Sequence, residues 1–265
     1  MDKNVQFKGL WAVILGGSSG FGYAAVEKLT NHGMNVALLY RETSVTEQPL
    51  LKKLATLAKA TQVNILPYNI NALDAAGRDA FITKIKYLVD KHSVKLLLHS
   101  IARGNLKPLV AEGGAELSTE DIQLTSYAMA NSLLDWTRLL IKENFFAADS
   151  RIIGLTSEGA HKYWDSYAAI AIAKSSLESL AKYMAVEFSP AGLKTNIIQA
   201  GVTDTPALKM IPGSKKLIET SIARNPMGRL TTPKDVANVI YLLCTDEAFW
   251  INGSLIHVDG GEHCK

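Results

Sequence analysis

The chain has 265 residues, of which 48% are hydrophobic and 20% are charged, and its formal net charge is +3. This composition is too apolar for a disordered chain, and no run of 18 apolar residues is present that would cross a membrane. Charges of both signs are interspersed, and no dense basic run with interleaved aromatic residues indicates a nucleic-acid partner. Cys244 and Cys264 form no Cys-x-x-Cys pair, and the polar residues 2–9 do not resemble a signal peptide, so we expect a reducing, cytoplasmic location.

Short, almost continuously apolar runs alternate with longer segments that have helical character. Such runs are typical of strands buried on both faces of a parallel sheet. The predicted strands are Leu10–Leu15, Asn35–Tyr40, Val63–Tyr68, Lys95–Ser100, Arg151–Thr156, Thr195–Gln199 and Leu255–Val258. Their alternation with helices predicts an α/β fold, a Rossmann-like doubly wound sheet of seven parallel strands flanked by helices. No linker or repeat interrupts the pattern, so we expect one domain spanning residues 1–265.

The segments between the strands are predicted to be helical, and two of them carry start signals. The predicted helices are Gly22–His32, Thr46–Ala60, Ala75–His92, a long helix from Ser118 to about Phe146, Trp164–Phe188 and a last one from Thr232. Ser118 with Asp121, and Thr232 with Pro233 and Asp235, have the spacing of N-terminal caps.

Two long loops follow strands at the edge where such sheets bind ligands. These loops are Arg103–Leu117 and Gly201–Pro226. The second contains a helical piece, Lys215–Arg224, and we interpret residues 203–226 as a lid over the substrate.

The first strand leads directly into a glycine-rich turn and a helix. The turn reads Gly16-Gly17-Ser18-Ser19-Gly20-Phe21-Gly22. Glycines allow the backbone to approach a pyrophosphate, and the helix N-terminus supplies N–H groups and a positive dipole end. A plain glycine-rich turn is the alternative, but the flanking strand and helix favour dinucleotide binding.

The Gly-x-x-x-Gly-x-Gly spacing resembles that of the short-chain dehydrogenase/reductase (SDR) family. The resemblance extends along essentially the whole chain, to the closing Val258-Asp259-Gly260-Gly261. It implies that the loop residues, with Asn69 and Ile70 beside the adenine, bind a nicotinamide cofactor.

The residues after the second predicted strand bear on the choice of cofactor. Arg41 stands where a cation would meet the 2′-phosphate of NADPH, and Ser44 would add a hydrogen bond. Glu42 keeps NADH open, and a surface Arg41 paired with Glu42 or Glu47 is a further alternative. We favour NADPH over NADH.

Lys174 and Tyr167 form the candidate catalytic pair. Most SDR enzymes that reduce carbonyls use Tyr-x-x-x-Lys, but here Ile170 occupies the position four residues before Lys174. Tyr167 lies seven residues before Lys174, nearly two helical turns, and therefore on the same side of a helix. Tyr163, four residues earlier, would share that side. The alternatives are a tyrosine packed in the core and a surface lysine.

This Tyr-x6-Lys spacing resembles the enoyl-[acyl-carrier-protein] reductase branch of the SDR family. His99-Ser100-Ile101-Ala102 and Ser126-Tyr127-Ala128 resemble type I enzymes, in which the first of these segments meets the cofactor. Ala200-Gly201-Val202-Thr203-Asp204-Thr205 resembles the loop that meets the nicotinamide amide. Ser157 instead matches the NADPH-dependent type III enzymes and also stands where ordinary SDR enzymes carry their catalytic serine. The resemblance also implies that Thr156, the residue before Ser157, contacts the cofactor. The resemblance is therefore mixed.

The resemblance implies hydride transfer to the β-carbon of an α,β-unsaturated acyl thioester, carried by acyl-carrier protein or coenzyme A. Tyr167 would donate a hydrogen bond to the enolate oxygen, with Ser157 nearby, and Lys174 would hold the nicotinamide ribose. Tyr163 and Met210 are further candidates for binding the acyl group. No histidine or cysteine spacing indicates a metal site.

Two other functions remain open. One is an SDR reductase that acts on a carbonyl or on a specialised unsaturated metabolite, and the other is a non-catalytic nucleotide-binding protein. SDR relatives bury long helices in subunit contacts, so the apolar residues of two predicted helices suggest a homotetramer. These residues are Met129, Leu133, Leu134, Leu177, Leu180 and Met184.

Overall fold

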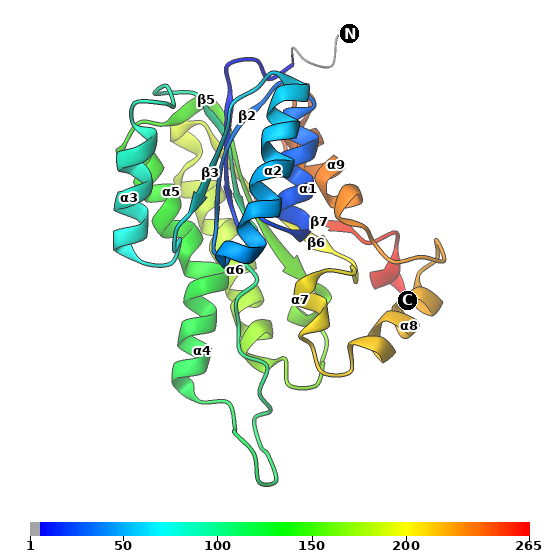
Figure 1. Cartoon of the computed structure of the whole chain (residues 1–265). Helices are drawn as coiled ribbons and strands as arrows, with labels where there is room; N and C mark the ends of the chain where they lie inside the picture. The colour runs from blue at the N-terminus through cyan, green and yellow to red at the C-terminus, as the bar shows by residue number, and fades with distance from the viewer. Residues whose placement is uncertain (1–5) are drawn as a thin grey trace.

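A computed structural model describes residues 6–265 and shows one sheet of seven strands flanked by helices (Figure 1). The strands are β1 (Trp11–Leu15), β2 (Asn35–Tyr40), β3 (Ile65–Asn69), β4 (Val94–His99), β5 (Phe146–Ser157), β6 (Leu193–Ala200) and β7 (Leu255–Val258). Their order across the sheet is β3-β2-β1-β4-β5-β6-β7, and all neighbours run parallel. The predicted α/β, Rossmann-like sheet is therefore confirmed. Residues 2–5, part of the polar segment weighed against a signal peptide, lie outside the described residues.

Helices cover both faces of the sheet. They are α1 (Gly20–Thr30), α2 (Ser44–Thr61), α3 (Ala75–Ile85), α4 (Thr119–Ser126), α5 (Ser132–Lys142), α6 (Ala168–Glu187), α7 (Pro206–Lys209), α8 (Ser214–Arg224) and α9 (Pro233–Cys244). Both predicted caps, at Ser118 and Thr232, form capping boxes with an aspartate three residues on. Within residues 6–265, no helix is long and apolar enough to cross a membrane.

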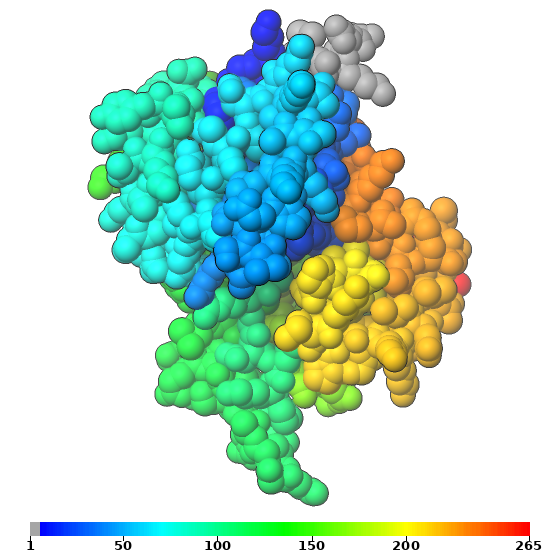
Figure 2. All heavy atoms as spheres, in the orientation of Figure 1, coloured from blue at the N-terminus to red at the C-terminus, as the bar shows by residue number. Residues whose placement is uncertain are grey.

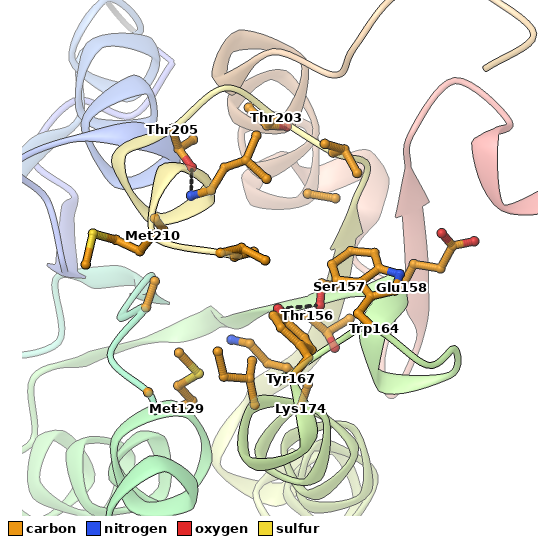
Figure 3. Close-up of a pocket in the computed structure, with 18 of the residues that line it drawn as sticks. Met129, Thr156, Ser157, Glu158, Trp164, Tyr167, Lys174, Thr203, Thr205 and Met210 are labelled. Atoms are coloured by element: carbon orange, nitrogen blue, oxygen red, sulfur yellow. Dashed lines mark hydrogen bonds between the residues drawn. The ribbon is translucent and has the colours of Figure 1, made fainter. Parts of the chain in front are cut away.

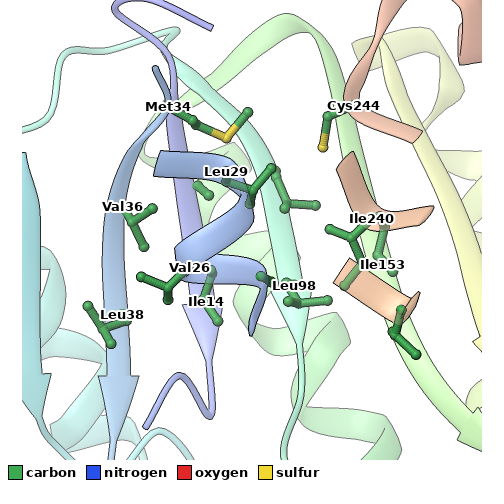
Figure 4. Close-up of a cluster of buried hydrophobic side chains, with 14 of the residues drawn as sticks. Ile14, Val26, Leu29, Met34, Val36, Leu38, Leu98, Ile153, Ile240 and Cys244 are labelled. Atoms are coloured by element: carbon green, nitrogen blue, oxygen red, sulfur yellow. The ribbon is translucent and has the colours of Figure 1, made fainter. Parts of the chain in front are cut away.

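The alternation of side chains along the strands creates two hydrophobic layers. Ile14, Leu38 and Leu98 face α1, α2 and α9 and pack with Val26 and Ile240 (Figure 4). The intervening residues of the same strands face the opposite layer, under α3, α5 and α6. Because both faces are buried, the strands read as continuous apolar runs in the sequence.

Three predicted helices differ from the observed ones at places where the backbone changes direction. The helix predicted from Ser118 to Phe146 is divided into α4, a π-helical turn (Tyr127–Asn131) and α5, and β5 already begins at Phe146. Left-handed residues mark two of the true ends: Asn144 (φ 56°) follows α5 and Ser166 (φ 58°) precedes α6. The predicted helix to His92 instead ends at Ile85, where α3 passes into turns. The flanking residues are as apolar as the helices, so periodicity alone does not show these breaks.

The residues predicted to form a tetramer interface lie mostly inside the subunit. Leu133, Leu177 and Met184 belong to the core beneath α5 and α6, and Met129 is also buried. These positions therefore cannot form a subunit contact. The exposed apolar side chains of α4 and α6 are instead Leu124, Ile172, Tyr183 and Val186.

Arg151 is a fully buried charge that ties β5 to the C-terminal end of α9. Its Nε donates to the Leu243 carbonyl at 2.6 Å, its Nη2 to the Thr245 carbonyl at 3.3 Å, and its Nη1 pairs with Asp149 at 2.5 Å. Asp149 also pairs with two lysines. Arg151 thus satisfies carbonyl groups that a helix end would otherwise leave unpaired.

We therefore expect Arg151→Leu to lower the free energy of unfolding by about 3–5 kcal/mol, because it removes one partner from a buried ion-pair network. Urea denaturation followed by circular dichroism measures this loss. The control is Arg138→Leu on the exposed face of α5, which we expect to change stability by less than about 0.5 kcal/mol. Equal losses in both variants would contradict the structural role of Arg151.

Candidate functional site

Backbone segments around the turn from β1 to α1 approach one another too closely for a side chain at two positions. Gly16 has a φ of 86°, and a Cβ there would lie 2.5 Å from the Ser100 carbonyl oxygen. A Cβ on Gly22 would lie 2.1 Å from the Gly16 carbonyl oxygen. The N-cap residue, Ser19, makes no side-chain hydrogen bond to the first turn of α1. The first N–H groups of α1 are therefore left for an anion such as a phosphate.

A groove of about 620 Å³ lies beside this loop, over the carboxyl ends of the central strands. It occupies the point where the strand order reverses between β1 and β4, the usual dinucleotide position in such sheets. Most of the predicted cofactor-binding residues line it: Gly16, Ser18, Ser19, Gly20, Phe21, Arg41, Ile70, Ser100, Ile101, Ala102, Thr156, Lys174 and Thr205. A phosphate-binding loop and an exposed guanidinium in one groove fit a nicotinamide dinucleotide.

Three predicted cofactor residues line neither this groove nor the cavity that adjoins it. Gly22 acts beneath the loop, by letting α1 pack against it. Asn69 holds the turn after β2, because its amide bonds both the N–H (3.1 Å) and the carbonyl (2.9 Å) of Glu42. Ser44 begins α2 and is exposed, with its neighbour Thr43 as the cap. In their place the chain after β3 contributes Asn71, Ala72 and Leu73, which no sequence motif signalled.

A second cavity, of about 530 Å³, continues from the groove and shares residues such as Thr156, Ser157 and Lys174 with it. Figure 3 shows Tyr167, Ser157 and Lys174 on one side of this cavity and Met210 on the opposite side. The predicted cofactor residues Ala200, Gly201 and Val202 line this cavity rather than the groove. Its apolar wall consists of Leu106, Met129, Trp164, Ile170, Leu208 and Ile211.

Tyr167 is buried at the N-terminal end of α6, with 6% of its surface exposed. Its Oη lies 3.2 Å from Ser157 Oγ, and its ring packs against Trp164 with centroids 5.0 Å apart. Gly159 makes room for the ring, since a Cβ there would lie 2.6 Å from it. Burial raises the pKa of Tyr167, and the Ser157 hydrogen bond opposes this only in part. The phenol is therefore a protonated hydrogen-bond donor at neutral pH.

Lys174 is buried in the wall shared by the groove and the cavity. Its Nζ donates to the Leu155 carbonyl at 2.8 Å. Burial lowers the pKa of Lys174 to about 8, with the charge of Glu178 acting in the opposite direction. Burial and Lys174 together lower the pKa of His99 to about 3. His99 is therefore neutral, and its Nε2 lies 2.8 Å from Ser132 Oγ.

Tyr163, predicted to bind the acyl group, lies outside the cavity. It is 85% exposed, and its Oη donates to Asp165 at 2.6 Å. The prediction assumed a helix through residues 163–167, whereas α6 begins at Ala168 after the left-handed Ser166. Met210 does line the cavity, but at its rim, with 74% of its surface exposed. Met129, predicted to lie in a subunit interface, forms part of the apolar wall instead.

An ion-pair cluster joins α8 to the chain beside the cavity. Arg224, the last residue of α8, pairs with Glu158 and, at 2.8 Å, with Glu262. Lys162 also pairs with Glu158, at 2.6 Å. Burial would raise the pKa of Glu158, but the hydrogen bonds from Arg224 and Lys162 outweigh it and lower the pKa. Within residues 6–265, no group of three His, Cys, Asp or Glu side chains is arranged to hold a metal ion.

Comparisons with known proteins agree on the family. The family model described as "Enoyl-(Acyl carrier protein) reductase" matches residues 16–263. The enoyl-[acyl-carrier-protein] reductase [NADH] FabI of Aquifex aeolicus is 32% identical over 187 residues, which cover 70% of this chain and 68% of that protein. A tropinone reductase homolog of Arabidopsis thaliana is 25% identical over 264 residues, 98% of this chain and 81% of that protein.

Solved structures show the same fold. A crystal structure of an enoyl-[acyl-carrier-protein] reductase (NADH) from Aquifex aeolicus VF5 matches with a TM-score of 0.83 at 25% identity, covering 98% of both chains. A Bacillus cereus enoyl-acyl carrier protein reductase with NADP+ and an indole naphthyridinone has a TM-score of 0.84 at 24% identity, covering 98% of both chains. The chain is therefore an NAD(P)-dependent oxidoreductase of the SDR superfamily and belongs to the enoyl-(acyl-carrier-protein) reductase family.

Proposed function

We propose that this protein is an NADPH-dependent reductase that saturates the double bond of an enoyl thioester. One observation carries the proposal: the buried, protonated Tyr167 faces the cavity beside Lys174, while the apolar Ile170 occupies the position of the usual carbonyl-reducing tyrosine. The family model and the Aquifex aeolicus relative, named for enoyl-[acyl-carrier-protein] reduction, support it.

The residues around the cavity suit this chemistry. The bound nicotinamide would supply hydride to the β-carbon of the unsaturated thioester, which leaves negative charge on the thioester oxygen. Tyr167 donates a hydrogen bond to that oxygen, and Ser157, 3.2 Å from the Tyr167 hydroxyl, orients the phenol or donates a second bond. Lys174 holds the cofactor ribose and adds positive charge, and the apolar wall excludes water from the reacting carbons.

Reduction of a carbonyl is the second candidate. The Ser157–Tyr167 hydrogen bond would let both hydroxyls converge on one substrate oxygen, an arrangement equally suited to a ketone. The similarity to a tropinone reductase homolog along 98% of this chain favours the same alternative. A substrate on acyl-carrier protein and one on coenzyme A present the same thioester to the cavity.

Residues 203–226 are proposed to form the lid. Leu208 of α7 and Ile211 after it contribute apolar side chains to the cavity. Figure 2 shows the yellow surface of this segment beside the green surface of the chain around residues 100–130. The Arg224 ion pairs with Glu158 and Glu262 hold the far end of this segment to the chain next to Ser157. We further expect a cytoplasmic homotetramer that covers the exposed apolar residues of α4 and α6.

The reaction is tested with purified protein, crotonyl and acetoacetyl thioesters, and either NADPH or NADH. We expect cofactor oxidation with the crotonyl thioester and NADPH, followed by absorbance at the nicotinamide band. Oxidation with acetoacetyl thioester alone would instead assign the protein to carbonyl reduction, and no oxidation with any substrate would contradict both candidates.

Replacing Tyr167 with Phe keeps the ring and its packing but removes the donor. We expect turnover of the crotonyl thioester to fall on the order of a hundredfold, with the dissociation constant of NADPH nearly unchanged. The matched control is Tyr163→Phe, which alters an exposed hydroxyl outside the cavity and should retain the parent rate. Wild-type turnover by Tyr167→Phe would exclude this phenol as the donor.

Arg41 is proposed to bind the 2′-phosphate of NADPH. No ion pair joins it to a carboxylate among residues 6–265; Glu42 accepts from Thr46 Oγ1 and Glu47 from Tyr40 Oη instead. Loss of a charge-assisted contact costs about 1.5–3 kcal/mol, so Arg41→Ala should raise the KM for NADPH by about 10- to 150-fold. The KM for NADH, which lacks the phosphate, should barely change. Equal increases for both cofactors would disprove the contact.

A further inference from the structure

A carboxylate outside the cavity lies one helical turn beyond Lys174. Glu178 on α6 accepts a hydrogen bond from Thr156 Oγ1 at 2.6 Å through Oε1, and its Oε2 lies 3.1 Å from His161 Nε2. Its side chain is 12% exposed and lines neither the groove nor the cavity. The site already described gives this carboxylate no role, although two polar side chains hold it in place.

Few negatively charged groups surround the buried Lys174 ammonium. Among residues 6–265, no carboxylate lies within the 4.0 Å of an ion pair from its Nζ, whose hydrogen bond goes to a neutral carbonyl. His99, from β4, is buried and neutral. Tyr167, on the same helix, stays protonated. Within α6, the negative charge of Glu178 is what favours the charged form of Lys174.

We infer that Glu178 is a positioning residue whose carboxylate, fixed between Thr156 and His161, keeps the Lys174 ammonium charged so that it holds the cofactor ribose. The inference rests on the cofactor role of Lys174 proposed above. It requires neither an enoyl substrate nor a preference for NADPH.

The direction of the effect follows from the balance of burial and charge. Burial lowers the pKa of Lys174 to about 8, and Glu178 raises it against that tendency. The ammonium is therefore present below this pH and is lost as the pH rises through it. Without the charge of Glu178, the loss begins at a lower pH. The other titratable groups beside Glu178 are His161, whose Nε2 lies 3.1 Å from Glu178 Oε2, and His257. Burial lowers the pKa of His257, so the His257 imidazole is neutral near pH 8.

The test is the affinity for NADPH and for NADH between pH 6 and pH 9, measured by nicotinamide fluorescence on the whole protein. A neighbouring charge shifts a pKa by roughly one unit or more, so Glu178→Gln should bind either cofactor about fivefold more weakly than the parent at pH 8 and equally well at pH 6. Glutamine keeps the shape and an acceptor for Thr156, so only the charge is lost. Comparing each variant with the parent in the same buffer removes titration of the cofactor itself.

Three further variants separate charge from structure. Glu178→Asp retains the charge and should restore most of the affinity at pH 8. Glu187→Gln, an exposed glutamate at the end of the same helix, should match the parent at every pH. Lys174→Met should abolish the alkaline loss of affinity altogether.

The inference is overturned by any of three results. The first is a Glu178→Gln curve that coincides with the parent curve. The second is equal weakening of binding by Glu178→Gln at pH 6 and pH 8, which is a structural effect. The third is an alkaline loss of affinity that persists in Lys174→Met. A protein that fails to reduce enoyl thioesters but shows the expected curves would refute the proposed function and leave the role of Glu178 standing.

Discussion

The site depends on the packing of α6 against the carboxyl end of β5. Four successive residues of β5 each lie against a different residue of α6 or of its N-cap position. A Cβ on Gly154 would lie 3.2 Å from Leu177, the Leu155 carbonyl accepts from Lys174 at 2.8 Å, Thr156 donates to Glu178 at 2.6 Å, and Ser157 Oγ lies 3.2 Å from Tyr167 Oη. A rotation or slide of α6 would disturb all four contacts together. The helix thus has one position, which brings its phenol and its ammonium to one wall.

The same burial determines the protonation of both groups. Burial raises the pKa of Tyr167, which keeps the phenol a hydrogen-bond donor. Burial also lowers the pKa of Lys174 to about 8, so the ammonium loses its proton at a pH only slightly above neutral. A site that excludes water strengthens the hydrogen bond to a developing anion but also weakens the hold on a cation. Glu178, supported from behind by Thr156 and His161, offsets the second effect without entering the cavity.

The segment between β6 and α9 is held by charge as well as by packing. Arg224 at the end of α8 pairs with Glu158, the residue next to Ser157, and with Glu262 near the C-terminus. Its Nε and Glu262 Oε2 are buried without a partner among residues 6–265. A cluster with such unsatisfied atoms is less firmly held than a fully satisfied one, which is compatible with the lid proposed for residues 203–226.

The sequence by itself determined the sheet and the phosphate-binding loop, because runs buried on both faces and glycines at close approaches leave direct marks on composition. Spacing also pointed to Tyr167 and Lys174, which both line the cavity, but the helical argument behind it holds only in part because Tyr167 lies at the N-cap position, before the first turn of α6. The helical periodicity of apolar residues continues across points where the backbone leaves the helix, so the sequence did not show where α6 begins. The left-handed Ser166 sets that start, and Tyr163, which precedes it, therefore lies exposed outside the cavity. Tertiary structure alone brought Met129 into the cavity wall and set Glu178 behind Lys174, because contacts between β5, α6 and the π-helical turn join residues whose positions in the chain carry no common signal.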